Sequence, residues 1–408
     1  MHIGRQTCLL ALGLIANLAP VATFAAVLPE IKSAWGLSAG EAGWIGGVYF
    51  AGYAAAVPVL ASLTDRIDGR WIFAFSSLLG AVATLALGGW ADGFWSALVL
   101  RLIGGIGLGG VHMPGLKLLA ERSAGRARAR GSAIYAAAYN LGAAGSFFLA
   151  GWADAAFGWR GAFVISGLVP LLAIGAVALL PEPAEAVPVA GFTIDIRPLL
   201  RNRALVAYVL AFAGNIWEVA AIRAWFVAFL AWTLALPHNG LNIPGPAAIS
   251  GLASLAGFPV SLAVAECALR WGRRAIVATC ITSVVVLLAL AVAAGGSSRV
   301  VLPLLVVAQI ASLADASALA SGAVAAAEPA RRGAALALYA FIGYAAAFTG
   351  PVVTGIVIDL FGGASDRRGW SAAFATMALG STVAAWAMRR VRAERGHLGG
   401  RGARDAGR

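Results

Sequence analysis

The chain contains few charged residues. Only 12% of its 408 residues are Asp, Glu, Lys or Arg, and 61% are hydrophobic, which gives a mean hydropathy of +0.85. Soluble domains carry about 25% charged residues because they need a polar surface. The composition therefore excludes a water-soluble globular protein and indicates a protein whose solvent is the lipid bilayer.

Groups that support catalysis are scarce and scattered. The three cysteines form an odd set in or beside apolar runs, which predicts neither a disulfide framework nor a metal site. The chain has no Gly-x-x-x-x-Gly-Lys-Ser/Thr loop for nucleotide phosphates, and its histidines have no paired carboxylates beside them. We therefore expect no enzyme, no ATP-driven pump, no cofactor and no bound metal. The residues concerned are Cys8, Cys267, Cys280, His2, His112, His238 and His397.

Apolar runs long enough to cross a membrane fill most of the chain. A spanning helix needs about 20 predominantly apolar residues, and twelve such runs can be located. The eighth is the weakest, because it opens on Gly245 and Pro246. The sequence predicts an all-α integral membrane protein with helices over 8–28, 42–63, 71–91, 94–117, 132–154, 159–180, 204–230, 245–265, 275–294, 300–326, 334–360 and 369–388.

The basic residues predict the orientation of these helices. The net charge is +12, but the 30 lysines and arginines lie in short loops and in the C-terminal tail rather than on one face, so nucleic acid is not an expected partner. Of these residues, 23 fall on the side of the N-terminus, five in the opposite loops and two inside spans. Cytoplasmic loops are enriched in Lys and Arg. We therefore expect an inner-membrane protein with both termini in the cytoplasm and basic loops against lipid headgroups.

The chain repeats itself at about half its length. Gly-Arg pairs follow spans 2 and 8, Arg-Gly pairs open spans 5 and 11, and Phe-Gly pairs close them, at shifts of 202 to 204 residues. Three matches at one shift and at equivalent places predict two six-helix halves. We expect halves at 1–180 and 204–388, a proline-rich cytoplasmic linker at 181–203 and a basic cytoplasmic tail at 389–408.

Two motifs resemble those of a transporter family. The segment Thr64-Asp-Arg-Ile-Asp-Gly-Arg70 between spans 2 and 3 resembles motif A of the major facilitator superfamily, and Glu266–Arg274 is a degenerate copy. Arg101-Leu-Ile-Gly-Gly-Ile-Gly-Leu-Gly109 in span 4 resembles motif B. The resemblance covers nearly the whole chain. It implies two halves that rock around a site near the midplane of the membrane, lined by spans 1, 4, 7 and 10.

The resemblance also implies a gate at motif A and its copy. We expect Asp65 to meet an inner helix end or an arginine of a neighbouring helix and to hold the outward-open state of the transport cycle. The residues assigned to gating are Asp65, Arg66, Gly69, Arg70, Glu266, Arg270, Gly272 and Arg273. The first copy has one extra residue between its Asp-Arg pair and its glycine. Span 5 lacks the Gly-Pro pair typical of proton-coupled exporters, and Gly350-Pro351 lies in span 11 instead.

Polar and charged residues deep in the spans are the candidate site. A charge at the bilayer centre costs at least about 2.5–3.5 kcal/mol, so such groups normally face a cavity or a partner. All seven candidates lie in spans 1, 4, 7 and 10, and His112 and Asp315 occupy equivalent positions of the repeat. We expect a solute cavity lined by Asn17, Arg101, His112, Asn215, Glu218, Arg223 and Asp315.

Two of these residues are candidates for proton coupling. Glu218 has apolar neighbours such as Trp217 and Val219, and burial among them favours the neutral carboxyl. The hypothesis is that Glu218 carries a proton, with Asp315 as runner-up and Arg101 as the partner that favours ionisation. Each residue also has a structural alternative: Arg101 could bond helix carbonyls, and His112 could be a packing residue.

These observations favour a secondary transporter. We expect a monomer that moves a small polar or anionic organic solute by alternating access, with proton symport as the leading mechanism. Its expected partners are the solute, protons and membrane lipid. Two alternatives stay open, a proton-coupled efflux antiporter and a polytopic membrane sensor that transports nothing.

Overall fold

The computed structural model describes residues 4–64, 66–123, 125–181, 197–237, 239–328 and 331–390. Within these ranges the chain is helical and contains no strand. The first eight helices are α1 Arg5–Leu18, α2 Thr23–Ala26, α3 Leu28–Trp35, α4 Ala39–Leu63, α5 Gly69–Trp90, α6 Phe94–Glu121, α7 Gly125–Leu168 and α8 Leu171–Ala178. The other eight are α9 Arg197–Arg201, α10 Arg203–Ala235, α11 Pro246–Trp271, α12 Arg273–Ala293, α13 Ser298–Ala314, α14 Ala316–Ala326, α15 Arg332–Leu360 and α16 Arg367–Arg390.

The sixteen helices make twelve membrane crossings, as the apolar runs predict. Ten stretches are long and apolar enough to span by themselves, and one of them, Gly125–Ala178, has 54 residues. At 1.5 Å per residue that is about 80 Å, more than twice a hydrocarbon core of about 30 Å. The stretch turns at Gly158, whose φ of 72° suits glycine, so it crosses twice. The remaining crossing is α1–α3, interrupted at Pro20, which lacks the amide for a continuous helix.

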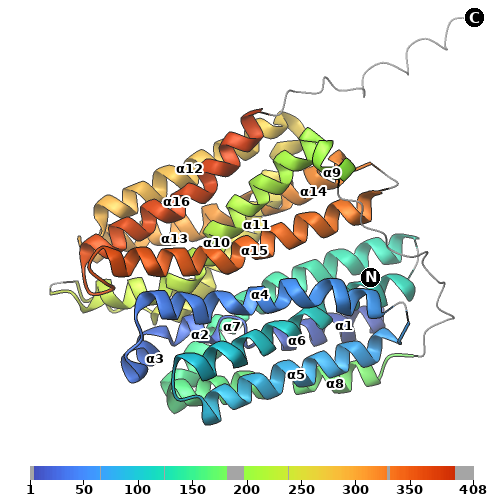
Figure 1. The fold of residues 1–408 in the computed structure, drawn as a ribbon, viewed down its shortest axis with the longest axis horizontal. Helices are drawn as coiled ribbons and strands as arrows, with labels where there is room; N and C mark the ends of the chain where they lie inside the picture. Colours follow the sequence, from blue (N-terminus) through green and yellow to red (C-terminus); the bar gives the residue numbers. More distant parts are fainter. Residues whose placement is uncertain are drawn as a thin grey trace, which may run out of the picture.

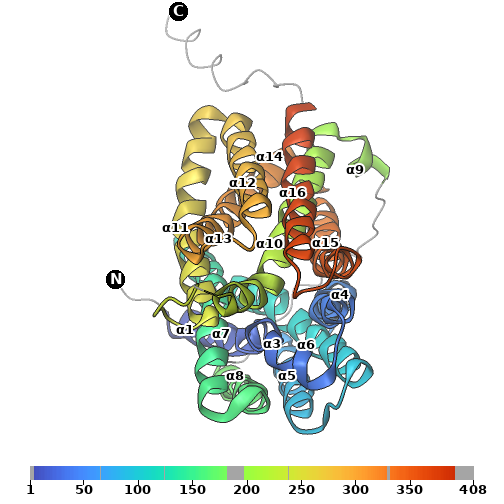
Figure 2. The ribbon, with the colours of Figure 1, turned by 90° about the vertical axis from the view of Figure 1, so that its left-hand side faces the viewer.

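The crossings form two bundles. Figure 2 shows α1–α8 as one group and α10–α16 as the other. The end of the molecule where Arg5, Glu121, Arg203 and Trp271 lie is called here the terminal end, and the opposite end the closed end. The ribbons of α4 and α15 run side by side and diverge toward the terminal end (Figure 1). The division into halves at 1–180 and 204–388 stays a prediction, and most of the proposed linker (182–196) and tail (391–408) lies outside the described residues.

Glycines let the two bundles approach closely on the closed-end side. A Cβ atom on Gly43 would lie 2.5 Å from the Pro351 carbonyl oxygen, and one on Gly47 would lie 2.3 Å from that of Phe348. Small residues at such points allow helix backbones to touch in a membrane. Any side chain here would push α4 away from α15.

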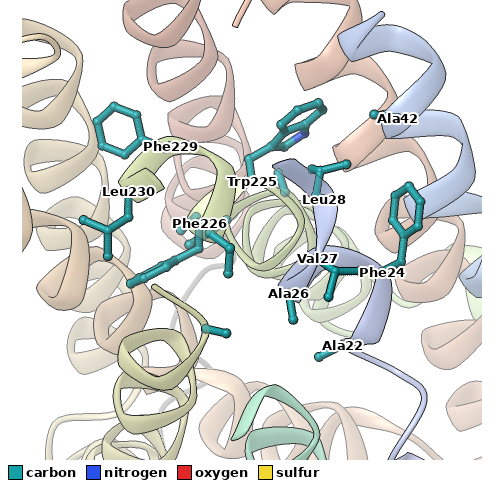
Figure 3. Close-up of a cluster of buried hydrophobic side chains, with 14 of the residues drawn as sticks. Ala22, Phe24, Ala26, Val27, Leu28, Ala42, Trp225, Phe226, Phe229 and Leu230 are labelled. Atoms are coloured by element: carbon teal, nitrogen blue, oxygen red, sulfur yellow. The ribbon is translucent and has the colours of Figure 1, made fainter. Parts of the chain in front are cut away.

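A large apolar cluster fills the closed-end side between the bundles. It combines side chains of α2, α3 and α4 with those of α10, and Figure 3 shows Phe24, Leu28, Trp225 and Phe226 among them. Trp225 is 1% exposed and donates its indole N–H to the Pro351 carbonyl at 3.3 Å. The cluster therefore seals the space between the bundles at this end.

Candidate functional site

A small cavity lies between the two bundles beneath this seal. Its volume is about 60 Å³, and both bundles contribute to its walls. The walls are mostly apolar and aromatic, with Phe24, Phe50 and Phe147 from one bundle and Trp225 from the other. The charged residues among its lining residues are two arginines, Arg101 of α6 and Arg223 of α10. No carboxylate is among the lining residues.

Arg101 is a buried cation that forms no ion pair with another residue of the described part of the chain. It is 6% exposed, and its contacts are weak: the Ile45 and Pro20 carbonyl oxygens lie 3.5 Å from its nitrogens. Its guanidinium carbon lies 4.3 Å from the centre of the Tyr49 ring, a cation–π arrangement. Among the described residues it forms no ion pair with Glu218 or Asp315, so the expected partnership with those acids is wrong.

Arg223 brings a second positive charge to the same walls from the other bundle. Its Nε is buried and has no hydrogen-bond partner among the described residues. Arginine presents a planar fork of donors that matches a carboxylate. Neighbouring α10 residues Ala220 and Ala224 also line the cavity, so this stripe of α10 faces the other bundle. A cavity with two cations and aromatic walls is suited to an anion that carries an apolar ring.

Tyrosines from both bundles form a floor on the terminal side of the cavity. The rings of Tyr53 and Tyr344, one from each bundle, have centroids 4.1 Å apart. The side chains of Tyr53 and Tyr139 are hydrogen-bonding neighbours of Tyr344. His112 joins this layer through its Nδ1, 3.1 Å from the Tyr53 hydroxyl. Its ring centroid lies 4.7 Å from that of Tyr139.

The two candidate acids lie inside the second bundle. Glu218 is 0% exposed, accepts a short hydrogen bond from the Ser283 hydroxyl and lies close to Ser381. Its other oxygen, Oε2, has no partner among the described residues. The carboxyl therefore points toward α12 and α16, and it is not among the residues that line the cavity.

Asp315 occupies the break between α13 and α14 and is 2% exposed. Its Oδ1 accepts from the Asn215 amide at 2.6 Å, and its Oδ2 accepts from the Cys280 thiol at 3.3 Å. Glu218 with Ser283, and Asp315 with Asn215 and Cys280, are thus two buried polar clusters close enough to interact electrostatically, called here together the acid network. It lies within the second bundle and is separate from the cavity lining.

The remaining cavity candidate has a local role. The Asn17 amide donates to the Gly13 carbonyl at 2.8 Å and to the Ser77 hydroxyl at 2.9 Å. Both partners belong to its own bundle. Of the seven candidates, the structure therefore brings Arg101 and Arg223 to one cavity and places His112 in the tyrosine floor beneath it. It groups Asn215, Glu218 and Asp315 in the acid network.

The sequence motifs assigned to gating make contacts within their own bundles. Asp65 lies outside the described residues, so its role stays a prediction, and Arg66 is exposed. Arg70 pairs with Asp68 at 2.7 Å and donates to the Leu180 carbonyl, while Gly69 packs closely against Leu118.

In the second copy, Glu266 and Arg270 are 3.5 Å apart. Gly272 has a φ of 58° that suits glycine, and the buried Nη1 of Arg273 has no hydrogen-bond partner among the described residues.

A carboxylate that the sequence did not assign to the gate joins the two bundles at the closed end. Asp359, near the end of α15, accepts hydrogen bonds from the first backbone amides of α4. These are Ala39, at 2.9 Å, and Gly40, at 2.6 Å. The first amides of a helix have no partner within it, and the helix dipole attracts a negative charge there. Asp359 therefore caps a helix of the other bundle and holds this end closed.

Removing this cap should open the closed end more often. Asp359→Ala deletes two charge-assisted hydrogen bonds, so we expect a loss of about 1.5 kcal/mol, or about tenfold in the opening equilibrium. The measurement is the rate at which a membrane-impermeant maleimide, added outside intact cells, labels the Ala25→Cys variant, whose new thiol lies in the cavity wall. Cys8 and Cys267 are replaced by serine in every protein compared. Asp366→Ala is the control, because Asp366 caps its own helix through Arg368. Equal labelling rates with and without Asp359 would contradict a latch.

Comparison with known proteins identifies the family. Residues 10–321 match the family model of the Major Facilitator Superfamily. The chain belongs to this superfamily. The fold agrees with solved members: the nucleoside transporter NupG (D323A mutant) superposes with a TM-score of 0.79 at 14% identity, covering 94% of this chain and 99% of that one. A bacterial homologue of the human lysosomal transporter Spinster, in an inward-facing and unoccupied conformation, gives 0.79 at 16% identity, covering 95% and 98%.

Curated relatives match over shorter stretches. The niacin transporter NiaP of Acinetobacter baylyi is 28% identical over 38% of this chain and 35% of its own length. The 4-hydroxybenzoate transporter PcaK of Pseudomonas putida is 28% identical over 52% and 48%, and the gallate transporter of Pseudomonas putida is 29% identical over 40% and 37%. The aligned stretches thus span less than half the length of each relative.

Proposed function

We propose that the protein is a secondary transporter that carries a small aromatic carboxylate across the bacterial inner membrane by alternating access. The observation that carries the proposal is the pair of cations, Arg101 and Arg223, in an aromatic-walled cavity between the bundles without a carboxylate in its lining. The names of the relatives support it, because niacin, 4-hydroxybenzoate and gallate are each one aromatic ring with one carboxylate.

In the proposed complex the carboxylate lies between the two guanidinium groups and the ring packs against the aromatic walls. The desolvated cations then gain the counter-ion that the protein does not provide. A cavity of about 150 Å³ is needed for benzene, so the present 60 Å³ must widen as the solute enters. Movement of Tyr53 and Tyr344, which meet across the interface, would supply that space.

The proposed orientation places both termini and the 181–203 linker in the cytoplasm, on the basis of the distribution of lysine and arginine. The terminal end then faces the cytoplasm, and the end capped by Asp359 faces outward. The labelling of Ala25→Cys from outside tests this orientation together with the latch. If Ala25→Cys reacts with the maleimide only in inverted vesicles, with or without the Asp359 substitution, the proposed orientation is wrong. A monomer is sufficient, because both arginines belong to one chain.

We further propose proton symport, because the acid network lies buried within the same bundle that contributes Arg223. The deciding experiment is uptake of labelled nicotinate or 4-hydroxybenzoate into vesicles that contain the purified protein, with the outside more acidic than the lumen. Accumulation that a protonophore abolishes supports symport. Accumulation driven only by the opposite gradient, with the lumen more acidic than the outside, would support the efflux antiporter, and binding without flux would support the sensor. Equal uptake of neutral nicotinamide would overturn the anion site.

A further inference from the structure

A second hollow lies on the outer surface of the α10–α16 bundle, away from the solute cavity. This groove, about 770 Å³ in volume, runs between α11, α12 and α13. Its floor and walls include Val260 and Val264 of α11, Ala278 of α12 and Ile310 of α13. A volume of this size is in the range of ligand sites, about 300–1,000 Å³.

The groove is apolar along its length although two threonines line it. Thr279 donates its hydroxyl to the Ala275 carbonyl at 3.0 Å, and Thr282 donates to the Ala278 carbonyl at 2.9 Å. Both hydroxyls are thus satisfied by their own helix, which leaves the wall without a polar group in need of a partner. The groove therefore fits a hydrocarbon chain and offers nothing to a polar solute.

One end of the groove is cationic. Arg270, Trp271 and Arg274 line it at the terminal end, where α11 ends and α12 begins. The Arg270 side chain is 72% exposed, and its ion pair with Glu266, at 3.5 Å, is a surface pair of the kind that contributes little to stability. Trp271 is 66% exposed, as suits a tryptophan at the membrane interface. Arg274 forms no ion pair within the described ranges.

The length of the groove matches one leaflet of a bilayer. From Trp271 to Val260 along α11 is eleven residues, or about 16 Å at 1.5 Å per residue. The hydrocarbon core is about 30 Å thick, so the groove runs from the headgroup layer to about the midplane. A ligand with an anionic head at one end and an acyl chain of one leaflet's length fits both its charge and its depth.

We propose that this groove is a binding site for one anionic phospholipid of the leaflet at the terminal end. An acyl chain lies along Val260, Val264 and Ala278, and the headgroup phosphate lies between Arg270 and Arg274, displacing the weak pair with Glu266. Zwitterionic phospholipids carry the same chains without the net charge and bind more weakly. The proposal does not depend on which solute the protein carries.

The test is titration of the delipidated protein with phosphatidylglycerol and with phosphatidylethanolamine, read by native mass spectrometry. Each basic residue near an anionic surface contributes about 1 kcal/mol, so Arg270→Gln/Arg274→Gln should weaken phosphatidylglycerol binding by about tenfold or more. Ala278→Phe, which fills the groove at an exposed position, should weaken both lipids. The matched control is Arg126→Gln/Arg128→Gln, which removes two exposed arginines at the same end, outside the groove.

Cysteine reactivity gives a local readout in the unmodified chain. Cys267 lines the groove, whereas Cys8 is an exposed cysteine in the other bundle. Phosphatidylglycerol should slow the reaction of Cys267 with a maleimide by several-fold and leave that of Cys8 unchanged. Equal losses of lipid binding in the groove and control arginine variants would overturn the proposal. So would wild-type binding by Ala278→Phe, or equal affinity of wild type for the two headgroups.

Discussion

Replacing Arg101 with alanine should abolish transport of the aromatic carboxylate and weaken its binding by at least about 30-fold. Removing one partner of a buried charge pair costs about 2–5 kcal/mol, and each 1.4 kcal/mol is a factor of ten in Kd. Arg101→Lys keeps the charge but loses the planar fork, so it should recover only part of the affinity. Isothermal titration of the purified variants with nicotinate gives the dissociation constants directly.

The anion site predicts a selective loss. Arg101→Ala should lose most of its affinity for nicotinate and little of any affinity for nicotinamide, which lacks the carboxylate. Arg223→Ala should behave in the same way, because its guanidinium lines the same cavity from the other bundle. A variant that loses both ligands equally would indicate a collapsed cavity rather than a missing charge.

Arg160, an exposed arginine with similar local contacts, provides a control for the structural role of Arg101. Its guanidinium also lies over an aromatic ring, 4.5 Å from the centre of Trp159, and also donates to carbonyls, those of Gly88 and Ala91. It does not line the cavity. Arg160→Ala should therefore leave nicotinate affinity unchanged while thermal unfolding reports any loss of packing. If folded Arg101→Ala binds nicotinate as tightly as wild type does, the carboxylate binds elsewhere.

Sequence reasoning located the crossings well because each rests on a local property. A run of about 20 apolar residues predicts a span whatever it packs against, and both the chain reversal at Gly158 and the start of α11 at Pro246 follow from local backbone preferences. The contact between bundles could not be found in this way. Gly43 and Gly47 matter only because α15 places the carbonyls of Pro351 and Phe348 against them.

The helices that line the cavity were predicted only in part: spans 1, 4 and 7 contribute, whereas α4, α7 and α15 line it unexpectedly and the lining residues include none from span 10. The direction of the side chains was not predicted. Glu218 and Ala220 are two residues apart, about 200° around α10, so the stripe with Ala220 and Arg223 faces the cavity while Glu218 points into its own bundle. A sequence alone does not say which stripe of a helix apolar all round faces the cavity. The tyrosine floor was missed, although the chain has only seven tyrosines and Tyr53, Tyr139 and Tyr344 among them meet at one layer. Asp359 was missed because its partner is a backbone 320 residues away.

Glu218→Gln should abolish proton-driven accumulation of the solute while leaving exchange intact. A carboxyl at 0% exposure whose hydrogen-bond partner is one serine hydroxyl has no counter-charge among the described residues, and an ionised group there would be poorly solvated. We expect it to hold a proton in the present state and to release it when the bundles rearrange. Glutamine keeps the shape and an acceptor for Ser283 but cannot carry a proton.

The size of the effect follows from the gradient. One pH unit is worth 1.36 kcal/mol per proton, so a symporter that moves one net proton per solute accumulates up to about tenfold. Glu218→Gln should bring this ratio to about one, while labelled solute still exchanges with solute inside loaded vesicles. Glu328→Gln is the matched control, because Glu328 is an exposed acid paired with Arg331 at 2.8 Å, and it should accumulate like wild type.

Asp315 gives the comparison that assigns the carrier. Its two oxygens accept from the Asn215 amide and the Cys280 thiol, donors that support an ionised group, whereas Glu218 has an unpartnered oxygen. We therefore expect Asp315→Asn to retain accumulation in part, with a disturbed network, and Glu218→Gln to lose it. If Glu218→Gln still accumulates solute under a pH gradient alone and Asp315→Asn does not, Asp315 is the proton carrier. Loss of exchange as well as accumulation in Glu218→Gln would instead make Glu218 a structural residue of the second bundle.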